Sequence, residues 1–259
     1  QIPIAEEFNW LRSEFSMAIA LQNLAWGIGQ PIFSAIAEKI GDRRAIILGA
    51  FTYASGLLLS SKAVTPEAHQ LYEILVGFGV AGTGFGVILA VVGRASSEKN
   101  RSMSLAIATA SGSVGQVIGA PMGEFLLSYM PWQTVFIIFS ISILFTLLLL
   151  PFMRVSVGET PKTLNHNMRA MVGKAVADPS YSMIFLGFFS CGYQLGFLTA
   201  HFPAFVTEMC SPILPTTGIY NLGITSTSIL GAISISLIGL ANIAGTLGAG
   251  YLGKTYSKK

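Results

Sequence analysis

Apolar residues fall into seven long runs along this chain, and short polar stretches separate them. Each run is about 20 residues long, the length at which an α-helix crosses the hydrocarbon core of a bilayer. We therefore predict an all-α membrane protein with seven transmembrane helices. The predicted spans are residues 15–37, 45–64, 71–93, 103–127, 132–153, 181–206 and 228–252.

The composition also indicates a membrane protein and excludes an ordinary soluble domain. Charged residues make up 10% of the chain and hydrophobic residues 52%, whereas a soluble domain usually carries about 25% charged residues. The two cysteines, Cys191 and Cys210, form neither a disulfide framework nor a set of metal ligands. No His-Glu-x-x-His pair and no nucleophile elbow lies beside a span, so we expect no enzyme activity, no metal and no cofactor.

The basic residues lie almost entirely on one side of the predicted spans. Alternate connections fall on opposite sides of the membrane, and one side receives 13 of the 15 lysines and arginines, leaving only Arg12 and Lys62 for the other. Because basic residues near span ends stay in the cytoplasm, we predict an N-terminus outside and a C-terminus inside. The net charge of +3 therefore reflects topology, and we expect no nucleic-acid partner.

Three ionisable residues, Glu73, Glu124 and His201, lie within the predicted spans near their outer ends. A charge near the centre of a span costs about 2.5–3.5 kcal/mol on the insertion scale, so such residues are candidates for function. Each lies within about five residues of the outer end of its span, or at most about 7 Å deep, which would place all three in one layer. They are predicted either to form a proton-coupling or gating cluster, or to reach the interface and hydrogen-bond to neighbouring helices.

Polar and small side chains form stripes on several spans. The polar positions are candidates for lining a water-filled pathway, with helix–helix hydrogen bonding as the alternative. The glycine positions are predicted packing sites, because small residues let membrane helices approach closely. The candidate pathway residues are Gln22, Gln30, Ser113, Gln116, Ser190 and Gln194, and the predicted packing residues are Gly77, Gly79, Gly115, Gly119 and Pro121.

A tight, charged turn separates the first two spans. Residues 34–44 read Ser-Ala-Ile-Ala-Glu-Lys-Ile-Gly-Asp-Arg-Arg. The end of the chain repeats this pattern, because residues 21–44 align without gaps on residues 236–259, with a base, three residues and two bases in each. Such internal repeats are typical of secondary transporters, which hold their substrate between two halves near the bilayer midplane.

These motifs resemble those of the major facilitator superfamily over nearly the whole chain. Residues 34–44 are similar to the signature Gly-x-Leu-Ala-Asp-Arg-x-Gly-Arg-Arg between that family's second and third helices, with Ser34 and Asp42 in place of the usual Gly and Arg. Residues 73–79 resemble the fourth-helix pattern Arg-x-x-x-Gly-x-Gly, with an acid in place of the arginine.

Two further patterns extend the resemblance. Residues 115–123 are similar to the fifth-helix pattern Gly-x-x-x-Gly-Pro, and Trp132 is similar to the tryptophan that begins the sixth helix. Residues 9–16 resemble the monocarboxylate and oxalate–formate branch just before its second helix.

The resemblance implies a fold, a domain division and an activity. It equates the seven spans with the second to eighth of twelve helices in a two-bundle fold. Residues 1–153 would form an N-terminal bundle that lacks its first helix, residues 154–179 a cytoplasmic linker, and residues 180–259 the first two helices of the C-terminal bundle. The implied function is a secondary active transporter, or a fragment of one, that moves a small solute by alternating access, with proton coupling as an option.

The charged turn is also a candidate mechanical element. We predict that Glu38, Lys39, Gly41, Arg43 and Arg44 form a conformational latch, because cations are favoured at the C-terminal ends of neighbouring helices. Ordinary positive-inside topology is the alternative explanation of these charges.

The expected setting is the bacterial plasma (inner) membrane, with lipids, a small solute and protons as partners. Two alternative identities stay open. One is a seven-helix receptor, which fits the number of spans and the outside N-terminus, and the other is a truncated product that does not transport.

Overall fold

The computed structural model describes residues 2–153, 168–214, 218–221 and 223–255, and every regular element in these ranges is a helix. The predicted all-α fold class is therefore confirmed. The elements are α1 (Ile2–Phe8), α2 (Arg12–Ile40), α3 (Asp42–Ser60), α4 (Pro66–Thr83), α5 (Phe85–Ala95), α6 (Arg101–Tyr129), α7 (Trp132–Thr146), the 3₁₀ helix η1 (Leu147–Phe152), α8 (Met168–Ala177), α9 (Pro179–Cys210), α10 (Gly218–Asn221) and α11 (Thr227–Thr255).

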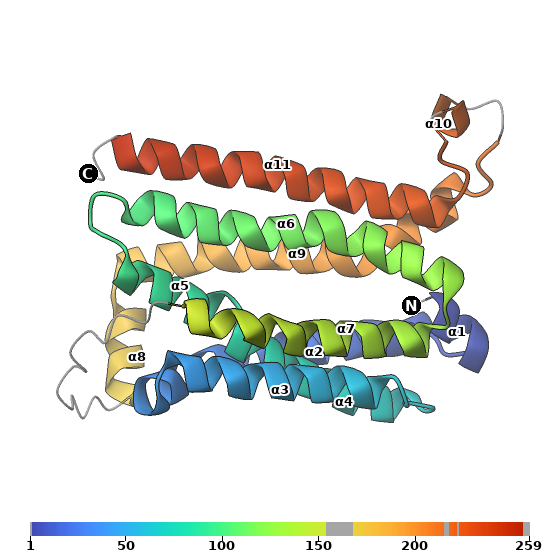
Figure 1. Ribbon diagram of the computed structural model, residues 1–259. Helices are drawn as coiled ribbons and strands as arrows, with labels where there is room; N and C mark the ends of the chain where they lie inside the picture. The colour runs from blue at the N-terminus through green and yellow to red at the C-terminus, as the bar shows by residue number, and fades with distance from the viewer. Residues whose placement is uncertain (1, 154–167, 215–217, 222, 256–259) are drawn as a thin grey trace.

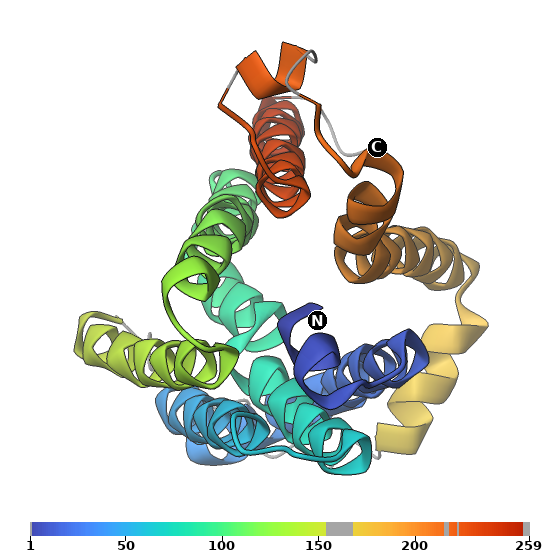
Figure 2. The same cartoon turned by 90° about the vertical axis from the view of Figure 1, so that its right-hand side faces the viewer.

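The long helices lie side by side and run the length of the molecule, with the connections at its two ends (Figure 1). The end view in Figure 2 shows them as a ring. In this ring α4 packs against both α2 and α3, α7 packs against α3, and α6 pairs with α11. Helix α9 contacts α11 and, more weakly, α2, which closes the ring.

Local sequence explains where several helices begin. Thr65 accepts a hydrogen bond from the backbone N–H of Ala68 at 3.3 Å, and a proline follows it as the first residue of α4. Asp178 does the same for α9, accepting from the N–H of Ser180 at 2.9 Å, again with a proline next. A capping oxygen satisfies one free N–H, and proline removes a donor that the helix could not pair.

The third predicted span, residues 71–93, lies within a segment that is long and apolar enough to cross a membrane, Pro66–Ala95, but its helix is not continuous. It divides at Gly84 into α4 and α5, where the backbone is extended with φ −89° and ψ −166°. A Cβ added at Gly84 would lie 2.5 Å from the carbonyl oxygen of Val80, so the break needs a glycine there. The density of glycines in this run favours such a break, because glycine is among the weakest helix formers.

Seven helical segments occupy the seven predicted spans, and five of the described segments are long and apolar enough to cross a membrane by length and composition. Helices α2 and α3 are not among these five. Three charged residues begin α3, and Gln22, Asn23 and Gln30 interrupt α2, which lowers their mean hydropathy. Both nevertheless lie in the ring with the other long helices (Figure 2).

The predicted linker at residues 154–179 is described only in part. Residues 168–177 form α8, a helix that leads directly to α9. The remainder of the linker, residues 154–167, lies outside the described residues, as do Lys258 and Lys259 of the proposed repeat. The division into two bundles therefore stays a prediction.

Candidate functional site

At one end of the bundle, the joint between α2 and α3 contacts two other elements. Arg43 donates a hydrogen bond to the backbone carbonyl of Met153, the residue that follows η1. Asp42 begins α3 and pairs with Arg94 in the last turn of α5, whose Nη2 lies 2.7 Å and 2.8 Å from the two carboxylate oxygens. Each charge has the sign that its own helix end favours. These contacts tie the start of α3 to the ends of α5 and η1.

The predicted latch residues differ in their surroundings. Gly41 forms the turn between α2 and α3 with φ +92°, a region that favours glycine. Glu38, Lys39 and Arg44 have exposed side chains. From sequence, Asp42 is only a departure from the family motif, and nothing in a single sequence links it to a residue 52 positions away. The function of this turn as a latch stays a prediction.

At the opposite end of the bundle, Glu73 has a side chain only 12% exposed and two polar neighbours. Its Oε1 accepts a hydrogen bond from Oγ of Ser60 at 3.2 Å. The same oxygen lies 4.0 Å from Nε2 of His69, one turn earlier on α4. Partners of this kind are expected, because a carboxylate withdrawn from water is costly without them. Each of the two neighbouring groups, the carboxyl and the imidazole, can bind a proton.

The contacts described in the structure do not join the three predicted proton-coupling residues. Glu73 lies on α4, Glu124 is partly exposed on α6, and His201 is exposed on α9 with its ring 5.1 Å from that of Phe197. Sequence reasoning missed His69, because this residue precedes the apolar run that defined the span. Its spacing of four residues from Glu73 was the available signal.

The interface between α6 and α11 is lined with small and polar residues. Asn242 donates a hydrogen bond to Oγ of Ser113 at 2.9 Å, and Ser236 donates to the carbonyl of Val117 at 3.0 Å. Gly250 approaches α6 so closely that an added Cβ would lie 2.3 Å from Cβ of Ala106. This is the close packing with hydrogen bonds that holds helices together in lipid.

The candidate pathway residues have different surroundings. Ser113 is buried in the α6–α11 interface, which fits the alternative of helix–helix hydrogen bonding. The side chain of Gln30 lies against Gly86, since a Cβ added there would be 1.8 Å from its Oε1. Gln22 and Gln116 are partly exposed, and Ser190 and Gln194 are exposed on α9. A role in a pathway stays a prediction for all six.

Two of the predicted packing glycines make very close contacts. A Cβ added at Gly77 would lie 2.2 Å from the carbonyl oxygen of Gln22, and one at Gly79 would lie 2.3 Å from the backbone of Tyr53. At Gly115 and Gly119, no described atom beyond the adjoining residues and backbone of α6 lies within 4 Å of such a Cβ. Helix α6 continues through Pro121 without a break.

One ion pair connects the start of α2 with the end of α9. Arg12 begins α2, and its guanidinium donates to a carboxylate oxygen of Glu208 in the last turn of α9. The two residues are 196 positions apart, and they come from the two predicted bundles. Both side chains are more than half exposed, so the pair adds little to the free energy of folding. It shows that the start of α2 lies next to the end of α9.

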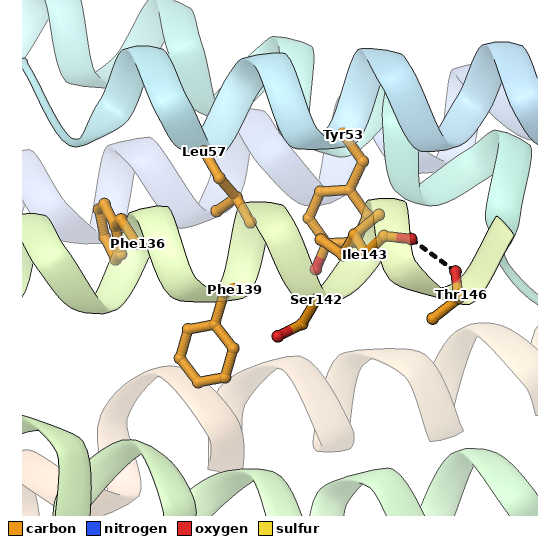
Figure 3. Close-up of a pocket in the computed structure, with 7 residues that line it drawn as sticks. All are labelled: Tyr53, Leu57, Phe136, Phe139, Ser142, Ile143 and Thr146. Atoms are coloured by element: carbon orange, nitrogen blue, oxygen red, sulfur yellow. Dashed lines mark hydrogen bonds between the residues drawn. The ribbon is translucent and has the colours of Figure 1, made fainter. Parts of the chain in front are cut away.

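A groove of about 380 Å³ lies between α3 and α7 (Figure 3). Tyr53 and Leu57 form one wall, and α7 supplies the other. The hydroxyl groups of Ser142 and Thr146 donate to carbonyls of their own helix at 2.8 Å and 2.6 Å. The groove therefore offers mostly apolar surface, and it lacks the converging polar groups expected of a site for a polar solute.

The sequence of this chain is similar to the sequences of known membrane transporters. The model of a family described as Major Facilitator Superfamily matches residues 1–259. The chain is 22% identical over 209 residues to an MFS-type transporter, YcxA, of Bacillus subtilis, a match that covers 77% of this chain and 50% of the relative. No solved structure matches the chain.

Two other relatives are named for their solutes. The chain is 24% identical to the human voltage-gated purine nucleotide uniporter SLC17A9, over 52% of this chain and 32% of that protein. It is 32% identical to monocarboxylate transporter 13 of Bos taurus, over 50% of this chain and 28% of that protein. This chain thus spans between about a quarter and a half of the length of the three relatives.

Proposed function

Because the chain belongs to the major facilitator superfamily, we propose that it acts in secondary active transport of a small solute by alternating access. The α6–α11 interface is the observation that carries this proposal. It joins the two predicted bundles along two long helices, through close-packed glycines and hydrogen-bonding serines. Alternating access requires movement of one bundle against the other, and this interface is where the two predicted bundles meet.

The domain division and the orientation belong to the same proposal. Residues 1–153 form one bundle, residues 180–259 begin the second, and residues 154–179 connect them. The α2–α3 joint, the α5–α6 turn and the end of α11 lie at one end of the molecule (Figure 1). Their lysines and arginines support a cytoplasmic location for this end and an outer location for α1, in a bacterial plasma membrane.

Monocarboxylates are the first solute class to test. The name of the relative from Bos taurus states this class, and residues 9–16 resemble the monocarboxylate and oxalate–formate branch. In the proposed cycle, Glu73, Glu124 and His201 are candidates for proton coupling. The residues at positions 38–44 act as a latch by holding the start of α3 against the end of η1 through Arg43.

Uptake into proteoliposomes tests this proposal. We expect radiolabelled lactate to accumulate when the outside is more acidic, and the Glu73→Gln/Glu124→Gln double variant to lose at least tenfold of this proton-driven uptake. The matched control is Glu67→Gln, which removes an exposed carboxylate from the first turn of α4. Uptake that the double variant leaves unchanged would refute the proton-coupling residues, and ligand binding without any flux would favour a receptor.

A further inference from the structure

His69 lies among aromatic side chains from three different parts of the chain. Its ring centre is 5.8 Å from that of Trp10, 6.1 Å from that of Phe15, and 6.4 Å from that of Phe136, to which it is nearly parallel. These residues belong to the α1–α2 connection, α2 and α7. The side chain of His69 is only 9% exposed, and Glu73 lies beside it. Two titratable groups are therefore in contact and shielded from water.

The first helix forms a cover over this end of the bundle. Ile4 of α1 is buried in a cluster with Trp132, and Trp10 packs against the same cluster. Glu7 fastens the cover by accepting a hydrogen bond from Nε1 of Trp132 at 2.5 Å. Asn9 turns the chain back with φ +55°, a conformation that asparagine tolerates better than most residues.

Most charged groups near His69 and Glu73 form hydrogen bonds with residues outside this pair. On α3, the hydroxyl of Ser60 donates a hydrogen bond to the carboxylate of Glu73. Tyr53 on the same helix interacts electrostatically with this carboxylate. From α2, the carboxylate of Glu14 accepts from the N–H of Leu11 at 2.7 Å. On α1, Glu7 is bound to α7. Within the described residues, no ion pair joins His69 or Glu73 to a lysine or arginine.

The net charge of the pair determines how many protons it holds. Without a proton the site carries a buried negative charge, and with two protons it carries a buried positive charge. With one proton it is neutral overall, whichever residue holds the proton. Because an uncompensated buried charge is costly, the covered site favours one proton. Gaining or losing a proton then favours opening of the cover.

We propose that His69 and Glu73 form a proton-binding pair whose proton exchanges with the outer side when α1 and Trp10 move away. Ser60 orients the carboxylate in this pair. In the proposed transporter the pair is the proton-coupling site, a role that rests on the proposed function. Its ability to bind protons does not depend on transport, and it can be measured without a solute.

Tryptophan fluorescence of the purified protein tests the pair directly, because a cationic imidazole quenches a neighbouring indole such as Trp10. We expect emission to fall in two coupled steps as the pH is lowered, because the ring shares its titration with the carboxylate. His69→Gln loses both steps. Glu73→Gln leaves a single step, because the ring then titrates without a coupled partner. The control Glu67→Gln, at an exposed position on the same helix, leaves both steps unchanged.

Two results would overturn the inference: a pH-dependent fall in emission that persists in His69→Gln, or a two-step titration that Glu73→Gln leaves unchanged. If a variant does not fold, ring ¹⁵N chemical shifts of the three histidines in the unaltered protein provide the test. We expect one ring to titrate in two coupled steps, and three independent single-step titrations would contradict the proposal.

Lactate uptake into proteoliposomes is a separate measurement, which tests whether the pair has a role in transport. A pair that titrates as expected in a protein whose uptake ignores the pH gradient would refute proton coupling and leave the proton site standing. Proton-driven uptake in a protein whose histidines titrate independently would refute the proton site alone.

Discussion

At the scale of single residues, Gly79 shows how closely α4 approaches α3. A Cβ at this position would lie 2.3 Å from backbone atoms of Tyr53, and backbone cannot move aside as a flexible side chain can. We expect Gly79→Ala to lower the free energy of unfolding by about 1–3 kcal/mol, the usual effect of overpacking. Thermal unfolding of the purified protein measures this change.

Gly115→Ala is the matched control, because no described atom beyond the adjoining residues and backbone of α6 lies within 4 Å of the added Cβ. Alanine is a better helix former than glycine, so this variant should keep or slightly raise the unfolding temperature. Equal destabilisation by both substitutions would show that the approach of α4 to α3 is looser than the structure indicates.

Asn9 is a second residue whose conformation is testable. Its φ of +55° is unfavourable for a β-branched side chain, so we expect Asn9→Val to cost about 1–2 kcal/mol and to detach α1 from the bundle. Trp132, now buried, would become exposed, and its emission would move to longer wavelength. Asn9→Gly accepts the same conformation and should retain the buried spectrum. An unshifted spectrum for Asn9→Val would contradict the role of this turn.

Residue patterns in the sequence predicted some contacts of the site and missed others. Glu73 was identifiable because an acid inside an apolar run is costly without a partner. His69 and Arg94 were not, because each lies near the end of its helix, where polar residues are common. Their partners depend on how helices pack, and a contact such as Asp42–Arg94 leaves no periodic signal in one sequence.

At the scale of the elements, the Asp42–Arg94 pair links α3 to α5. Arg94 is 55% exposed and Asp42 14% exposed, so solvent screens the pair and we expect a coupling energy of only about 0.5–1 kcal/mol. A double-mutant cycle with Asp42→Asn and Arg94→Gln, followed by thermal unfolding, measures it. Strictly additive single effects would mean that the two charges act only on their own helix ends.

The sequence predicted the helices well and their interruptions poorly. Long apolar runs predict helical spans because backbone groups in lipid must pair internally. The same runs do not show whether a helix continues through a glycine, so the break at Gly84 was missed, whereas α6 passes through Pro121 intact. Packing against neighbouring helices decides such cases.

At the scale of the whole molecule, the sequence predicted the family but not how the helices meet. The charged turn at residues 34–44 and the glycine patterns carry the family signal, and the match of the family model to residues 1–259 bears it out. The meeting of α2 with α9 depends on residues 196 positions apart, which no local pattern reveals.

The Arg12–Glu208 pair gives a test of the relative movement of the two predicted bundles. Spin labels can be attached at Ser13→Cys and Ser211→Cys in a chain whose Cys191 and Cys210 are changed to serine. With Arg12 and Glu208 unaltered, we expect one main distance between the two labels. Arg12→Glu places like charges together at the start of α2 and the end of α9. The population with longer distances should then grow, because like charges repel.

Exchanging both charges is the decisive control for this movement. Arg12→Glu/Glu208→Arg restores an attractive pair in the opposite direction, so the original distance distribution should return. Added salt should weaken the effect of the single variant, since both side chains are exposed and their charges are screened. Identical distributions in the single variant, the double variant and the unaltered pair would show that this contact does not control the distance between the two predicted bundles at this end. The α6–α11 interface would then have to set their positions.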